Sequence, residues 1–125
     1  ASAFPCDLMQ PEQITSVLAA IESKLGPVSV LLYNAGGGTF KTVEQASLED
    51  FEANWRINVQ GLVAATKAAL PQLRQHKTAS IVVTSASAAT RGRANTAPFA
   101  SAKAAQRSLL ICVSRARGSR LVLDL

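Results

Sequence analysis

Apolar residues recur at helical spacing over residues 11–25, "PEQITSVLAAIESKL", and this pattern predicts an amphipathic helix. The apolar stripe consists of Ile14, Val17, Leu18, Ile21 and Leu25. Pro11 suits the first turn of a helix, and the pair Gly26 and Pro27 predicts its end.

Two short runs of β-branched and aliphatic residues predict strands. The first, "VSVLLYN", covers residues 28–34 and precedes a flexible "AGGG" loop, and the second, "SIVVTSAS", covers residues 80–87 and precedes a polar loop. Continuous apolar runs are typical of strands covered on both faces, as in a parallel sheet.

A second helix is predicted to start near Ser47, because Ser47 and Asp50 approximate a capping box. Asn58 falls inside the apolar stripe of this helix, where a polar side chain needs a partner. Pro71 is expected in a bend or a fresh turn. The stripe itself consists of Leu48, Phe51, Trp55, Leu62, Ala65 and Ala69.

The last third of the chain predicts a helix from Ala97 to about Ala116, with Gly118 as its stop, and "RLVLDL" as the start of a further strand. The alternation of helices and strands predicts an α/β fold with a parallel sheet. Ligands of such sheets bind beyond the carboxyl ends of the strands. Residues 34–38 and 85–97 are therefore the candidate site.

Composition narrows the function classes. With 48% hydrophobic and 17% charged residues, the 125-residue chain favours one packed domain over disorder. The sequence has no long apolar run and no signal-peptide features, so we expect no membrane span and no signal peptide. The net charge of +5 is not accompanied by aromatics among the arginines, so we expect no nucleic-acid partner.

The side chains that commonly carry metal or thiol chemistry are few and dispersed. Cys6 and Cys112 lie far apart without metal-ligand spacing, so we expect reduced thiols, a cytoplasmic location and no metal site. His76, the only histidine, lies in the polar stretch "RQHKT" and is expected at the surface.

The stretch "APFASAK" places Phe99 four residues before Lys103, one helical turn apart on one face. An aromatic residue with a hydroxyl at position 99 would form a proton donor beside a cation that lowers its pKa. Phe99 has no hydroxyl, so this helix carries the cation without the acid.

Five short motifs follow one another along the chain: "CDL", "YNAGG", "INVQG", "IVVTSAS" and "FASAK". In this order the chain resembles the short-chain dehydrogenase/reductase family over nearly its whole length. The resemblance implies a Rossmann-like doubly wound parallel sheet, NAD or NADP as cofactor, a small-molecule carbonyl or alcohol substrate, and a homo-oligomer in the complete protein.

The resemblance also implies roles for individual residues. Cofactor binding falls on Asp7, Asn34, Ala35, Gly36 and Lys103, and catalysis on Asn58, Lys103 and Ser85. An ungapped alignment from Phe99 places the family's catalytic serine at Ala86, and a shift of one residue presents Ser85 or Ser87 instead. No such shift restores the tyrosine.

Phe99 stands where the family has its catalytic tyrosine, and this departure predicts weakened carbonyl reduction. General acid–base help contributes about 10²- to 10⁴-fold to such reactions. Hydride transfer with a proton from water or substrate stays open. The alternative function is a non-catalytic relative that binds cofactor or a partner subunit, and a third reading is an unrelated nucleotide-binding module.

The resemblance covers the central part of the family's domain, so we interpret residues 1–125 as a partial NAD(P)-binding Rossmann-like domain. The first strands and the Gly-rich phosphate loop are expected upstream of Ala1. In the family these absent strands lie between the third and fourth strands, so we expect residues 1–5 to have no partner in the sheet and the strands at Val28 and Ser80 to pair with each other. The tail after Ser108 has an unfamiliar composition.

Overall fold

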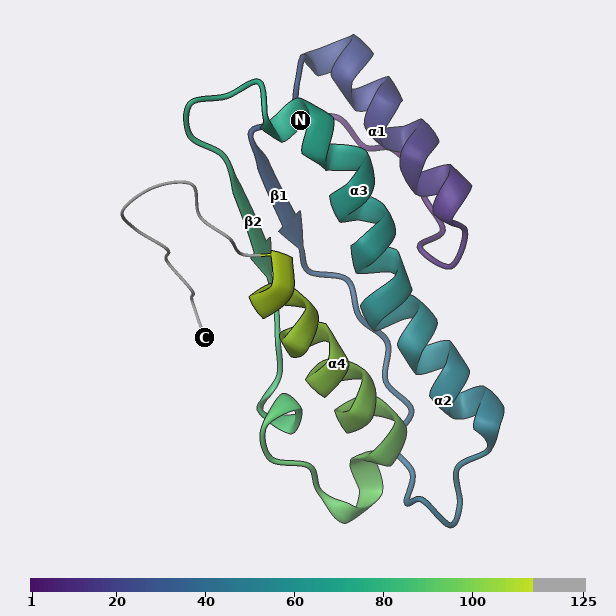
Figure 1. The fold of residues 1–125 in the computed structure, drawn as a ribbon. Helices are drawn as coiled ribbons and strands as arrows, with labels where there is room; N and C mark the ends of the chain where they lie inside the picture. Colours follow the sequence, from purple (N-terminus) through teal and green to yellow (C-terminus); the bar gives the residue numbers. More distant parts are fainter. Residues whose placement is uncertain (114–125) are drawn as a thin grey trace. The chain divides into compact units, whose positions relative to one another are not determined.

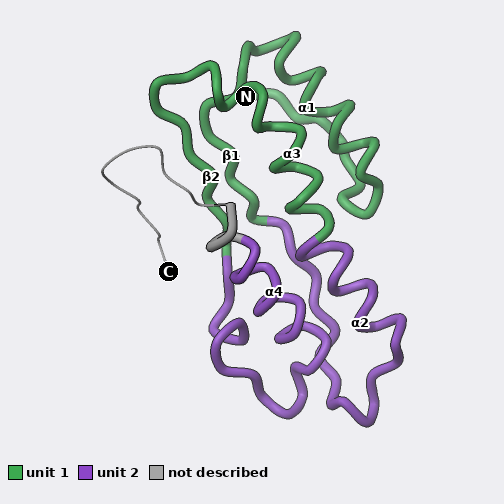
Figure 2. The backbone as a smooth tube through the Cα atoms, viewed as in Figure 1, with its two compact units in different colours: residues 1–34, 60–84 green, residues 35–59, 85–125 purple. Residues whose placement is uncertain are grey.

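A computed structural model describes the backbone of residues 1–113 and the side chains of residues 1–109. The chain divides into two compact units (Figure 2). Unit 1 comprises residues 1–34 and 60–84, and unit 2 comprises residues 35–59 and the chain from residue 85 onward. The predicted end of the last helix near Ala116, the "RLVLDL" strand and the Cys112 side chain lie outside the described residues.

Unit 1 contains a two-stranded parallel sheet, as the sequence predicts (Figure 1). Strand β1 (Val30–Tyr33) pairs with β2 (Ser80–Val83), with Val30 opposite Ser80. Both strands are shorter than predicted. Before β1, the Val28 amide donates to the Gln72 side chain at 3.0 Å instead of to a neighbouring strand. Residues 1–5 carry no strand.

Helices α1 (Pro11–Leu25) and α3 (Gly61–Leu73) supply the core of unit 1. Helix α1 has the predicted bounds, and Gly26 ends it with φ of 94°, a conformation that favours glycine. The helix α3 contacts both α1 and β1. As expected, the exposed Pro71 does not end the helix, but it lies within α3, which continues to Leu73, instead of in a bend or a fresh turn. Buried apolar residues of the two helices are Ile14, Leu18, Leu62, Ala65, Ala69 and Leu73.

One face of the strands is open in the part of the chain that the structure describes. Val30, Leu32 and Val82 are 55%, 62% and 42% exposed. Tyr33, on the opposite face of β1, is buried. The expectation of strands covered on both faces is therefore wrong for the described residues, since buried and exposed positions alternate as in a half-covered sheet.

Unit 2 contains helix α2 (Leu48–Trp55), most of the π-helical turn η1 (Arg56–Gln60), the short 3₁₀ turns η2 (Ser87–Ala89) and η3 (Ala94–Thr96), and helix α4 (Ala97–Val113). Within this unit α4 packs against α2, η2 and η3. The start of α4 at Ala97 is as predicted. The sequence predicts that the second strand extends to residue 87. In the structure residues 84–86 lie outside β2, and η2 begins at Ser87.

The predicted capping box at the start of α2 is confirmed. The Ser47 hydroxyl accepts from the Asp50 amide at 3.2 Å, and the Asp50 carboxylate accepts from the Ser47 amide at 2.9 Å. The apolar stripe of this helix is only partly buried, however. Leu48 is 84% exposed and Trp55 is 48% exposed, so these two residues are not core residues in the described structure.

Ser47→Ala is expected to lower the free energy of unfolding by about 1 kcal/mol, because the first turn of α2 loses its side-chain acceptor. Urea denaturation followed by circular dichroism measures this loss. Ser29→Ala, an exposed serine outside any helix, serves as the control with a change below about 0.5 kcal/mol. Equal effects of the two substitutions would contradict the capping role.

Neither a membrane-spanning helix nor a group of metal-binding side chains occurs among the described residues. Among residues 1–113, no helix has the length and apolar character that crossing a membrane requires. The described residues also contain no cluster of three or more His, Cys, Asp or Glu side chains suited to a metal ion.

Candidate functional site

Asn58 organises the π-helical turn of unit 2. Its side chain is fully buried, and Nδ2 donates to the Asn54 carbonyl and to the Gly37 carbonyl, each at 2.9 Å. The Asn54 carbonyl lies four residues earlier, where a regular α-helix would use a backbone N–H as donor. Asn58 thus connects the turn to the glycine loop. Single π-helical turns within helices occur frequently at functional sites.

Asn58 and Lys103 approach the same glycine. A Cβ atom at Gly36 would lie 3.1 Å from Asn58 Oδ1 and 3.3 Å from Lys103 Nζ, so a side chain at this position would crowd both groups. Asn58 Oδ1 is buried and accepts no hydrogen bond from the described residues. The structure therefore brings three of the predicted site residues together in unit 2: Gly36, Asn58 and Lys103.

Lys103 is a buried cation on α4, with an exposed fraction of 5%. Its Nζ donates to Gln106 Oε1 at 3.0 Å and lies 5.9 Å from the centre of the Phe99 ring. Burial lowers the pKa of Lys103, because the charged form loses solvation. The hydrogen bond to Gln106 and the nearby Phe99 ring stabilise the buried ammonium.

The Phe99 ring lies beside Lys103 on α4 and carries no hydroxyl. It pairs with Phe40 at a centroid distance of 5.4 Å and an interplanar angle of 46°. A Cβ at Gly38 would lie 3.0 Å from the Phe99 ring, so the glycine loop passes close to the aromatic pair. The ring therefore packs against its neighbours without offering a hydroxyl.

Tyr33, the only tyrosine of the chain, belongs to unit 1 and is buried in β1. Burial raises the pKa of Tyr33 to about 12, and the nearby Cys6 adds to the rise. A phenol with this pKa stays protonated at neutral pH and is a weak acid.

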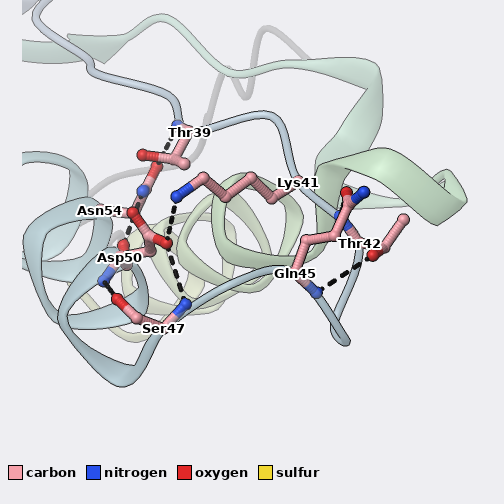
Figure 3. Close-up of polar contacts among 7 residues, drawn as sticks. All are labelled: Thr39, Lys41, Thr42, Gln45, Ser47, Asp50 and Asn54. Atoms are coloured by element: carbon pink, nitrogen blue, oxygen red, sulfur yellow. Dashed lines mark hydrogen bonds and ion pairs between the residues drawn. The ribbon is translucent and has the colours of Figure 1, made fainter.

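The loop that carries Gly36 is anchored to α2 by polar contacts (Figure 3). The Thr39 amide donates to Asn54 Oδ1 at 3.3 Å, and Lys41 Nζ contacts Asp50 Oδ2 at 2.8 Å. The hydrogen bond from Lys41, together with that from the Ser47 amide, lowers the pKa of Asp50. Asp50 therefore serves both the helix cap and the loop.

The remaining predicted site residues are divided between the two units. Asp7 and Asn34 belong to unit 1, where the Asp7 carboxylate accepts from the Met9 amide at 2.9 Å and Asn34 Oδ1 accepts from the Thr84 hydroxyl at 2.6 Å. Ala35 opens the glycine loop of unit 2. Ser85 follows β2 and is exposed.

The sequence analysis missed Gln106 and Asn54, which are both buried amides of unit 2. Gln106 Oε1 accepts from Lys103, and Gln106 Nε2 donates to the Asn58 carbonyl at 2.9 Å. One signal was present. Gln106 follows Lys103 by three residues, so the two share a helix face, and a polar residue on a buried face requires a partner.

Sequence comparison identifies relatives of this chain. A family model described as short chain dehydrogenase matches residues 1–120. The chain is 31% identical over 105 residues to the 2,3-dihydro-2,3-dihydroxybenzoate dehydrogenase of Bacillus subtilis (strain 168), an alignment that covers 84% of this chain and 40% of that protein.

Solved structures agree with the sequence comparison. A short-chain dehydrogenase from Streptomyces avermitilis superposes with a TM-score of 0.87 at 27% identity, covering 91% of this chain and 42% of that chain. The NADPH-bound short chain oxidoreductase from Pseudomonas aeruginosa PAO1, described as containing an atypical catalytic center, gives a TM-score of 0.84 at 25% identity, covering 87% and 42%.

This chain spans about 40% of the length of the Bacillus subtilis relative. The family match over residues 1–120, together with the parallel α/β arrangement shared with solved relatives, confirms the fold class implied by the resemblance. The chain belongs to the short-chain dehydrogenase/reductase family.

Proposed function

We propose that the protein binds NAD or NADP and exchanges hydride between this cofactor and a small carbonyl or alcohol substrate, with ordinary carbonyl reduction weakened by Phe99. The observation that carries the proposal is the approach of Asn58 Oδ1 and Lys103 Nζ to Gly36. A buried acceptor and a buried cation thus lie against a residue without a side chain, which lets the loop backbone come close to both polar groups.

These residues fit a nucleotide ribose. Ribose hydroxyls both donate and accept, so they complement the Lys103 ammonium, and a hydroxyl can also satisfy Asn58 Oδ1. In this proposal Gly36 and Ala35 form the loop around the cofactor, and Asp7 and Asn34 contribute further nucleotide contacts. A nicotinamide cofactor supplies the hydride when bound.

The chain's own residues hold and orient the reacting groups. Lys103 places positive charge beside the site, which favours any oxygen that develops negative charge. Asn58 keeps the glycine loop against the π-helical turn through its bond to Gly37. Ser85 is the proposed hydroxyl of the catalytic set. The proton donor at position 99 is missing, so protonation relies on water or substrate.

The second candidate is a non-catalytic member of the family that binds the cofactor or another subunit without turnover. The packing of Phe99 against Phe40 favours it, since the aromatic pair fills the donor position with apolar surface. The exposed Leu48 and Trp55 of α2 favour subunit contact, and we include a homo-oligomer in this proposal. The cytoplasmic location expected from the cysteines is likewise proposed.

Titration of NADH and NADPH into the protein, followed by nicotinamide fluorescence, tests the cofactor assignment. We expect binding of one nucleotide or both, and Lys103→Met is expected to weaken it about tenfold because a charge-assisted hydrogen bond is lost. Lys67→Met, an exposed lysine of α3 in unit 1, is the matched control and leaves the affinity unchanged.

Failure of both nucleotides to bind would contradict the oxidoreductase function and its cofactor-binding alternative together. Equal effects of Lys103→Met and Lys67→Met would instead contradict the assignment of Lys103 to the nucleotide site. Cofactor binding without turnover on a panel of ketones and alcohols would favour the non-catalytic candidate.

A further inference from the structure

We infer that Gln106 is a positioning residue, whose side-chain amide bridges the Lys103 ammonium to the backbone of the π-helical turn and so determines where the ammonium lies beside Gly36. The hydrogen-bond network itself stands independently of any activity. Only its effect on nucleotide affinity rests on the proposed function.

The bridge consists of two hydrogen bonds from one fully buried side chain. Lys103 Nζ donates to Gln106 Oε1 at 3.0 Å, and Gln106 Nε2 donates to the Asn58 carbonyl at 2.9 Å. Lys103 and Gln106 share a face of α4, whereas Asn58 lies 48 residues earlier in the π-helical turn. Gln106 therefore connects two distant segments of unit 2.

The chemistry of the two partners sets the orientation of the amide. An ammonium only donates, so it must face Oε1, and a backbone carbonyl only accepts, so it must face Nε2. The reversed amide would place two donors together at Lys103 and two acceptors together at Asn58. Glutamate lacks the donor and methionine lacks both groups, so neither residue reproduces the bridge.

The bridge continues into the glycine loop. Asn58 accepts from Gln106 through its backbone carbonyl and donates to the Gly37 carbonyl through its side chain. Lys103, Gln106, Asn58 and the loop are thus joined in one series of hydrogen bonds around Gly36. A long lysine side chain has many rotamers, and a fixed acceptor reduces the number that the ammonium samples before a ligand arrives.

The test is Gln106→Met, examined by nuclear magnetic resonance of the Lys103 side chain in the protein without nucleotide. We expect the Lys103 Cε and Nζ resonances to shift and its pKa to fall below the wild-type value, because the buried ammonium loses an acceptor. In nucleotide titrations the same variant is expected to lose about tenfold in affinity.

Gln72→Met is the matched control. Gln72 is also a buried glutamine with two hydrogen bonds, since Oε1 accepts from the Val28 amide at 3.0 Å and Nε2 donates to the Leu18 carbonyl at 3.2 Å. It belongs to unit 1. Its replacement is expected to destabilise the fold comparably and to leave the Lys103 resonances unchanged.

Unchanged Lys103 resonances in Gln106→Met, or equal shifts in Gln72→Met, would overturn the inference. Should Gln106→Met not fold, Gln106→Glu provides the second test, because a carboxylate beside the ammonium is expected to raise the pKa of Lys103, and an unchanged pKa would overturn it. The measurements of the Lys103 resonances and of its pKa are made without nucleotide. Failure of the proposed cofactor function would therefore be distinguished from failure of the bridge.

Discussion

Phe99→Tyr is expected to increase kcat/KM for carbonyl reduction by about 10²- to 10⁴-fold. The substitution adds a phenol to a ring whose centre lies 5.9 Å from Lys103 Nζ. A neighbouring ammonium favours the ionised phenol and lowers its pKa, which makes the added hydroxyl a better proton donor at neutral pH. Steady-state oxidation of NADH or NADPH with a panel of ketones measures the gain.

Phe40→Tyr is the matched control for this experiment. Phe40 packs against Phe99 and is 64% exposed, so the substitution adds a phenol to the aromatic pair while residue 99 stays unchanged. It is expected to leave the rate within about twofold of wild type, as is usual for a surface change. A wild-type rate equal to that of Phe99→Tyr would show that the phenylalanine does not limit proton transfer.

In the ungapped alignment Ala86 stands at the family's serine position, whereas a shift of one residue presents Ser85 or Ser87, and a further substitution tests this. Ala86→Ser alone supplies a hydroxyl without the phenol, and combined with Phe99→Tyr it restores both groups that the resemblance implies. We expect the double variant to exceed Phe99→Tyr in kcat/KM. An equal rate would indicate that Ser85 already serves as the site hydroxyl.

Asn58→Leu is expected to lower the free energy of unfolding by about 2–4 kcal/mol, because two carbonyl acceptors lose their donor. Asn58 Nδ2 bonds the Gly37 and Asn54 carbonyls at 2.9 Å each, and the side chain is fully buried. Leucine has a similar volume but offers neither bond. Urea denaturation followed by circular dichroism measures the difference.

Asn34→Leu is the control, because it shows how much stability is lost when an exposed asparagine is replaced by leucine. Asn34 is exposed, and its side chain accepts one hydrogen bond from the Thr84 hydroxyl at 2.6 Å. We expect a loss below about 1 kcal/mol for this substitution. Equal losses for the two variants would contradict the structural role assigned to Asn58.

Several features of the fold could be predicted from short segments. The helix at Pro11–Leu25 was predicted with its observed bounds, and the capping box at Ser47 was recognised from two residues. The apolar runs around Val30 and Ser80 predicted the two strands, and the family resemblance predicted that they pair. Capping and hydrophobic periodicity depend on residues close together in the sequence, so they can be recognised without the tertiary structure.

Burial was harder to predict. Leu48 and Trp55 share the helical spacing of buried residues and are nevertheless exposed. Val30 and Leu32 belong to a continuous apolar run and are also exposed. An apolar pattern shows which face of a helix or strand is suited to burial. Only the packed structure shows whether another element buries that face.

The sequence by itself determined the helix boundaries set by caps and prolines, the parallel pairing, the family resemblance, and the absence of a hydroxyl at Phe99 beside Lys103. Only the tertiary structure decided that Gln106 joins Lys103 to Asn58 and that both approach Gly36. The physical reason is range. Capping and periodicity act between near neighbours, whereas a hydrogen bond between residues 48 positions apart exists only after the chain has folded.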